Sequence, residues 1–153
     1  MRNLSAILLD LKPFFVVQEF VCPDIYKAYK ENAWQFIDRR LLENILWLRK
    51  ASGRAVIINT WHKGGTLSQR GLRCNLCALV LQKTKIGQLY LSAHQQGMAL
   101  DFDLAGWTAD KTRKFIEAHQ DEMPYPVRLE SDVTWVHMDV RTKGTEKVTY
   151  FKG

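Results

Sequence analysis

The sequence predicts an α+β domain in which helices flank a mainly antiparallel central sheet. One segment has the apolar spacing of an amphipathic helix, and two later segments alternate strictly between apolar and polar residues, as half-buried strands do. Helices and strands do not follow one another in the regular order of a parallel βαβ sheet. With 153 residues and no internal repeat or low-complexity linker, the chain is expected to form a single domain over residues 1–153.

The first predicted helix covers Asn32 to Ala51 and ends at Ser52 and Gly53. Its apolar residues fall three or four positions apart on one face, and they are Trp34, Ile37, Leu41, Ile45 and Leu48. The β-branched run AVIIN, from Ala55 to Asn59, predicts a short buried strand. The polar, basic and glycine-rich stretch that follows it predicts a long loop.

Two alternating segments predict strands with one apolar and one polar face. Between Met98 and Leu104, the aspartates Asp101 and Asp103 share the polar face. In VTWVHMDV, from residue 133 to 140, the polar face carries Trp135, His137 and Asp139. Both strands therefore present acidic or imidazole groups on one side and a core-facing apolar row on the other.

The remaining elements are a helix between these strands and a strand after them. Thr108 is a plausible N-cap for a helix that runs to about Gln120. A last strand, VTYF, is expected after a turn at Lys143 and Gly144.

Composition limits the classes of partner. The formal charge of +6 and the pI near 9.3 favour an anionic partner such as nucleic acid, a membrane surface or an anionic cell-wall polymer. The basic residues are scattered, so nucleic-acid binding is not expected. No apolar run reaches the length of about 18 residues that marks a membrane span, and the start of the chain lacks the pattern of a secretory signal.

The three cysteines, Cys22, Cys74 and Cys77, are too few for a framework of paired disulfides that uses every thiol. Cys74 and Cys77 form the motif CNLC, but a four-cysteine zinc site would require a second such pair. We interpret the three residues as ordinary reduced thiols, with a redox or metal-binding role as the alternative.

Polar side chains on an inner sheet face are costly unless they are paired or bind a metal. His94, Asp101 and His137 together offer two nitrogens and one oxygen, a set suited to zinc that leaves a fourth position for water. Gly97 would permit a tight turn between the first two of these residues. The alternative interpretation is a solvated sheet face with an unrelated histidine beside it.

The pattern Ser92-x-His94-x-x-Gly97-x-Ala99-x-Asp101, followed by WVHMD at Trp135 to Asp139, resembles two hallmark motifs of the zinc D-alanyl-D-alanine carboxypeptidase family. That family shares its fold with the Hedgehog signalling domain and includes vancomycin-resistance dipeptidases and phage endolysins. The motifs lie between Leu89 and Val140, and the N-terminal half is similar only loosely. The resemblance implies a Hedgehog/DD-peptidase-like fold.

The resemblance also implies roles for individual residues. His94, Asp101 and His137 would bind zinc, and Ser92 would support the first ligand. The family commonly has an acidic general base three residues before the last histidine, where this sequence has Thr134. In Hedgehog-like members a Glu-Ser pair lies further upstream, and LES at residues 129–131 is similar, so Glu130 is the expected base and Asp132 the alternative.

Other charged residues have supporting roles in this interpretation. An arginine upstream of the first motif contacts substrate in the family, and Arg70 and Arg73 are the matching candidates, or else solvated loop residues. Asp139 is expected to orient a ligand, and Asp103 is placed similarly.

The expected function is hydrolysis of D-amino-acid-containing peptides of bacterial peptidoglycan by a zinc metallopeptidase. The protein would be a monomer without a signal peptide, made in the cytoplasm and released to the cell wall by phage lysis machinery. The alternatives are a non-catalytic, zinc-stabilised binding module and, from charge alone, a nucleic-acid-binding protein.

Overall fold

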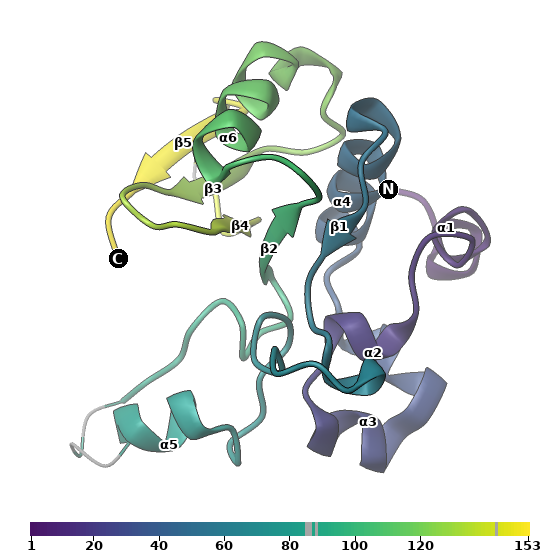
Figure 1. The fold of residues 1–153 in the computed structure, drawn as a ribbon, viewed down its shortest axis with the longest axis vertical. Helices are drawn as coiled ribbons and strands as arrows, with labels where there is room; N and C mark the ends of the chain where they lie inside the picture. Colours follow the sequence, from purple (N-terminus) through teal and green to yellow (C-terminus); the bar gives the residue numbers. More distant parts are fainter. Residues whose placement is uncertain (85–86, 88, 143) are drawn as a thin grey trace.

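The computed structural model describes residues 1–84, 87, 89–142 and 144–153, and these form an α+β fold (Figure 1). The α-helices are α1 Leu4–Leu11, α2 Val17–Phe20, α3 Pro23–Tyr29, α4 Arg39–Ser52, α5 Ala78–Thr84 and α6 Ala109–Ala118. Short 3-10 helices are η1 Lys30–Phe36, η2 Trp61–Lys63 and η3 Gln120–Glu122. The strands are β1 Val56–Ile57, β2 Ala99–Leu104, β3 Val127–Glu130, β4 Val136–Asp139 and β5 Val148–Phe151.

The described strands form one mixed sheet in the order β1-β2-β4-β3-β5. β1 pairs with β2, β2 with β4 and β4 with β3 in antiparallel fashion, whereas β3 and β5 are parallel. The prediction of a mainly antiparallel sheet is therefore corrected to a mixed one. The physical reason is that β4 and β5 are not neighbours, because β3 lies between them in the sheet. β3 and β5 both run opposite to β4, and they are therefore parallel to each other.

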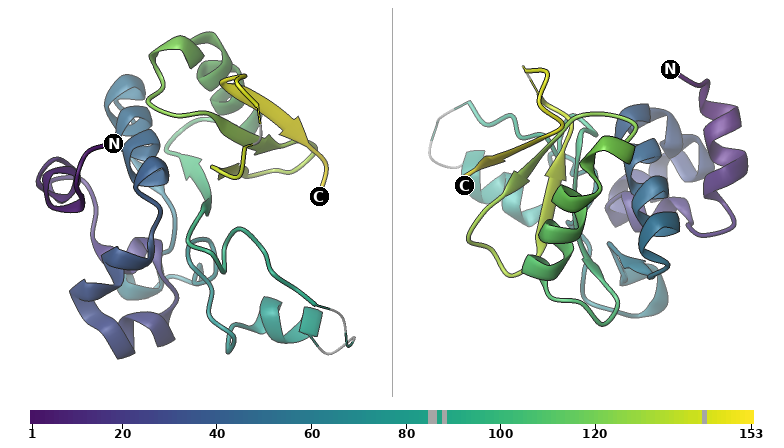
Figure 2. Two further views of the ribbon diagram at one scale, coloured as in Figure 1. Left: turned by 180° about the vertical axis from the view of Figure 1, so that it is seen from behind. Right: turned by 90° about the horizontal axis from the view of Figure 1, so that it is seen from above.

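Helices cover the sheet and enclose the core. The apolar rows of β2 and β4 are fully or almost fully buried, and they consist of Leu100, Phe102, Leu104, Val136 and Met138. Helix α6 packs against both strands, and α1 packs on the outer side of α4 (Figures 1 and 2). One side of the sheet is thus committed to the core, which leaves the other side for polar groups.

The predicted helix from Asn32 to Ala51 is divided in the structure. Ile37 is extended, with φ −96° and ψ 131°, and separates η1 from α4. The Asp38 carboxylate accepts a hydrogen bond from the Arg40 backbone N–H at 2.9 Å and so begins a new helix. The predicted end is confirmed, because Gly53 closes α4 in the left-handed conformation.

Thr108 caps α6 as predicted, with its Oγ1 3.2 Å from the Lys111 backbone nitrogen. The strands at β2, β4 and β5 are also confirmed. The buried strand expected from Ala55 to Asn59 is reduced to the two residues of β1, of which Ile57 is exposed. The sequence analysis missed α1, α2, α3, α5 and β3. Of the turn expected at Lys143 and Gly144, Lys143 lies outside the described residues. No helix in the described residues is long and apolar enough to cross a membrane.

Candidate metal centre

Strand register places two of the candidate ligands opposite each other. β2 and β4 pair so that Asp101 faces His137 across the antiparallel ladder. Both residues alternate with core residues, so their side chains lie on the sheet face opposite the core. Each residue is only 8% exposed, which makes the pair a buried polar contact.

His94 reaches the same place from a tight turn before β2. Ser92 and Gln95 fasten the start of this turn, because the Ser92 backbone N–H donates to Gln95 Oε1 at 3.0 Å and the Gln95 N–H donates to Ser92 Oγ at 3.3 Å. Gly97 closes the turn at φ +68°, and a Cβ atom there would lie 1.9 Å from the Phe36 carbonyl oxygen. Ser92 therefore supports His94 through the backbone of the turn.

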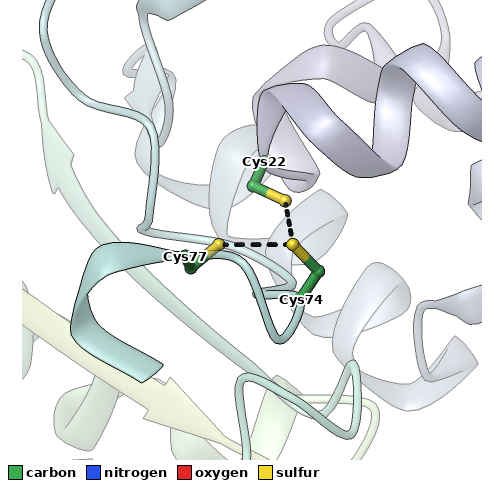
Figure 3. Close-up of side chains that lie close together, drawn as sticks. All are labelled: Cys22, Cys74 and Cys77. Carbon is green, nitrogen blue, oxygen red and sulfur yellow. Dashed lines mark hydrogen bonds between the residues drawn. The ribbon is translucent and has the colours of Figure 1, made fainter. Parts of the chain in front are cut away.

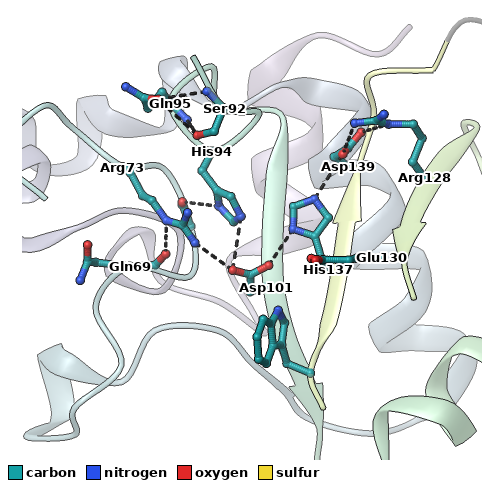
Figure 4. Close-up of polar contacts among 12 residues, drawn as sticks. Gln69, Arg73, Ser92, His94, Gln95, Asp101, Arg128, Glu130, His137 and Asp139 are labelled. Carbon is teal, nitrogen blue, oxygen red and sulfur yellow. Dashed lines mark hydrogen bonds and ion pairs between the residues drawn. The ribbon is translucent and has the colours of Figure 1, made fainter. Parts of the chain in front are cut away.

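The ligand atoms of the three residues converge (Figure 4). His137 Nδ1 lies 2.8 Å from Asp101 Oδ1, and His94 Nε2 lies 3.3 Å from Asp101 Oδ2. One donor atom from each residue lies within 4.8 Å of those of the other two. The three side chains thus form a buried group compatible with a bound metal ion.

The second nitrogen of each imidazole is already engaged. His94 Nδ1 lies 2.9 Å from the Gly71 carbonyl oxygen, to which it can only donate, so Nε2 carries the lone pair. His137 Nε2 lies 3.2 Å from Asp139 Oδ2, so it donates there and leaves Nδ1 for a metal. Both imidazoles thus direct their other ring nitrogen, His94 Nε2 and His137 Nδ1, toward the centre, as metal-binding histidines usually do.

Without a metal, a proton on His137 satisfies the two carboxylates. Burial alone would lower the pKa of His137, but the hydrogen bonds and negative charges of Asp101 and Asp139 outweigh it and raise the pKa to about 9. Despite their own burial, Asp101 and Asp139 have pKa values held below the usual range, by hydrogen bonds to His137 and, for Asp139, also to Arg128. Burial lowers the pKa of His94, so its ring is neutral.

Asp139 is fully buried and held by several donors. Arg128 on β3 makes two bonds to it, from Nε to Oδ1 at 2.9 Å and from Nη2 to Oδ2 at 2.8 Å. The Arg141 backbone N–H adds a third at 3.0 Å. The Asp139 carboxylate is therefore fixed where it receives the His137 N–H.

The two candidate arginines have different partners. Arg73 Nη2 lies 2.9 Å from Asp101 Oδ2, and its Nε donates to the Gln69 carbonyl, so this arginine belongs to the centre. Arg70 instead pairs with Asp103 at 2.6 Å. Asp103 shares the face of Asp101, but its partner is Arg70 rather than a candidate ligand.

A pocket of ≈ 410 Å³ opens onto the centre. Besides the three candidate ligands, its lining includes Arg73, Tyr90, Glu130, Trp135, Arg141 and Phe151. Asp132 is exposed, adopts a positive φ of 63° and pairs with Lys152 at 3.4 Å. Of the two acids proposed as the base, the structure places Glu130 at the pocket, whereas Asp132 bonds to a surface lysine.

Two residues that support the centre were not predicted from the sequence. Arg128 lies opposite Asp139 in the register of β3 and β4, but β3 is short and was not predicted. Gly71 contributes only a backbone carbonyl, which no side-chain pattern reveals.

No protein-family model matches this chain, and no curated protein or solved structure matches it significantly. Two imidazole nitrogens and a carboxylate oxygen can hold a divalent metal and leave positions open for other ligands.

Proposed function

We propose that this protein is a zinc metallopeptidase that hydrolyses D-amino-acid-containing peptide bonds of bacterial peptidoglycan, in the manner of a D-Ala-D-Ala carboxypeptidase or a phage endolysin. The observation that carries the proposal is the convergence of His94 Nε2, Asp101 and His137 Nδ1 at a pocket that Glu130 also lines. A donor set of two imidazoles and one carboxylate is a known arrangement for catalytic zinc. The two motifs that resemble the carboxypeptidase family supply the substrate class.

Zinc held by these residues would make water more acidic and polarise the amide carbonyl of a substrate. Glu130 is suited to accept a proton from the attacking water and to return it to the leaving amine. Within the described residues no hydrogen bond or ion pair reaches the Glu130 carboxylate, which lines the pocket and has Gly153 beside its Oε1. Arg73 holds Asp101 in place, and Arg141 on the pocket wall offers a positive charge to a substrate carboxylate.

The test compares two acidic residues that lie close together in the sequence. Zinc-loaded wild-type protein should release new amines or free D-amino acids from purified peptidoglycan peptides, and chelation should abolish the release. Glu130→Gln should retain its zinc but lose about 10²-fold to 10⁴-fold in kcat, because the proton acceptor is removed. Asp132→Asn is the matched control and should keep its activity. Full activity in Glu130→Gln, or none in zinc-loaded wild type, contradicts the proposal.

A second candidate is a non-catalytic, zinc-stabilised module that binds the cell wall or a protein. It is favoured by Thr134, which is exposed and occupies the position where the family commonly has its acidic base. This function predicts that zinc-loaded protein sediments with peptidoglycan sacculi without releasing products. Glu130→Gln would then bind as tightly as wild type.

A further inference from the structure

The thiol of Cys22 meets the two thiols of the CNLC motif, Cys74 and Cys77, which begin one residue after Arg73 in the chain. Cys22 Sγ lies 3.6 Å from Cys74 Sγ, and Cys74 Sγ lies 3.8 Å from Cys77 Sγ (Figure 3). All three sulfur atoms lie within 4.8 Å of one another, and Cys22 and Cys77 are buried. None of the pairs is a disulfide, and the three thiols are free.

The sulfur separations match those of a tetrahedral zinc site. Zinc–sulfur bonds measure about 2.3 Å, so two thiolates on one tetrahedral ion lie about 3.8 Å apart. The two measured edges of the cluster, 3.6 and 3.8 Å, have this length. A disulfide would require the sulfurs to approach to about 2.05 Å, which draws one pair together and leaves the third thiol unused.

The local backbone is arranged as in a chelating Cys-x-x-Cys turn. The Cys77 N–H donates to the Cys74 carbonyl at 3.2 Å, and the Leu76 N–H donates to Cys74 Sγ at 3.4 Å. Burial raises the pKa of the Cys74 thiol, and the Leu76 N–H at its sulfur offsets part of that rise in favour of the thiolate, which is the form that binds metal. An acidic oxygen lies at one edge of the cluster, since Asp24 Oδ2 is 3.9 Å from Cys74 Sγ.

We propose that Cys22, Cys74 and Cys77 form a second metal centre, a structural zinc site with the Asp24 carboxylate beside its fourth position. Thiolate sulfur selects soft or borderline ions such as zinc over magnesium or calcium. The three thiols are free, as the sequence analysis expected, and the proposal adds a metal-binding role to them, because Cys22 supplies a ligand that CNLC alone lacks. The inference does not depend on the peptidase function.

The site would fasten the start of α3 to the loop that supports the first centre. The same two segments already share backbone bonds, from Cys22 N–H to the Leu72 carbonyl at 3.1 Å and from Leu72 N–H to the Phe20 carbonyl at 2.7 Å. On either side of Leu72, the loop contributes the Gly71 carbonyl to His94 and the Arg73 guanidinium to Asp101. A metal at the cysteines would therefore hold the loop that orients two ligands of the other centre.

The first experiment uses wild-type protein purified under reducing conditions, with zinc measured by mass spectrometry. We expect about two zinc ions per chain. A thiol-specific mercurial should displace about one of them, and His94→Ala should lack the other. A single zinc that the mercurial leaves in place, or a mass showing an oxidised cysteine pair in the native protein, overturns the proposal.

The second experiment replaces zinc by cobalt, whose bonds to thiolates give a charge-transfer band in the near ultraviolet. The band should appear in wild type and in His137→Ala, and Cys74→Ser should lack it while remaining folded by circular dichroism. If Cys74→Ser does not fold, absence of the band from wild type still overturns the proposal. Loss of peptidase activity with the band intact would instead count against the proposed function alone.

Discussion

Arg73 Nη2 lies 2.9 Å from Oδ2 of Asp101, the same carboxylate oxygen that faces His94 Nε2 at 3.3 Å. The side chains of Arg73 and Asp101 are each 11% exposed, so solvent screens the pair little. Since Arg73 also donates to the Gln69 carbonyl, its guanidinium is fixed on two sides. The contact positions a candidate metal ligand and leaves Arg73 less free to bind substrate than the sequence suggested.

Arg73→Ala should weaken zinc binding by about 10-fold to 100-fold, the usual effect of removing a group that orients a ligand. Zinc affinity would be measured by competition with a chromogenic chelator. Arg70→Ala is the matched control, because Arg70 pairs with Asp103 and should leave the affinity unchanged. Tighter binding in Arg73→Ala would mean that relief of charge repulsion outweighs lost orientation, and it would contradict this account.

Asp139→Asn should also weaken zinc binding by about 10-fold to 100-fold. The neutral amide no longer fixes the proton on His137 Nε2. The proton can then move to Nδ1, where it blocks the lone pair that would bind the metal. Asp103→Asn removes a negative charge from the same sheet face and provides the control. The interpretation fails if both variants bind zinc equally well.

Patterns within one strand predicted which side chains share a face, and contacts between distant segments could not be predicted in the same way. Alternation placed Asp101 and His137 on polar faces, but their direct opposition depends on a register between strands 36 residues apart. Cys22 and Cys74 are 52 residues apart, and only the docking of α3 onto the loop brings them together. Local chemistry at Asp38, which caps a new helix, overrode an apolar periodicity that ran through it.

The stability of metal-free protein should depend on the protonation of His137. Its pKa is raised from 6.5 to about 9 in the folded state, so its stabilising contribution is complete below pH 6.5 and is lost as the pH rises through 9. The loss should approach about 3 kcal/mol in the free energy of unfolding. Urea titrations of chelator-treated wild type and His137→Gln, at several pH values, would measure it as the difference between the two curves.

His119→Gln is the control for this titration, since His119 bonds to the Phe115 carbonyl at the end of α6, outside the centre. A difference between wild type and His137→Gln that stays constant with pH would show that His137 is not held protonated by the two carboxylates.

Gly97→Ala should be far more destabilising than Gly53→Ala, although both glycines have positive φ. At Gly53, with φ +64°, a Cβ would meet nothing within 4 Å, so the cost is the left-handed conformation alone, about 1 to 2 kcal/mol. At Gly97 the Cβ would also lie 1.9 Å from the Phe36 carbonyl oxygen, a backbone atom that cannot rotate away. We expect a loss of more than about 3 kcal/mol in the free energy of unfolding, measured in urea.

The same substitution should reach the metal centre, because the turn that Gly97 closes also carries His94. Gly97→Ala should therefore bind zinc more weakly under conditions where it is still folded, whereas Gly53→Ala should bind like wild type. Equal stability losses in the two variants would show that the turn can move away from Phe36. His94 would then be held by the Gly71 carbonyl rather than by the rigidity of its own turn.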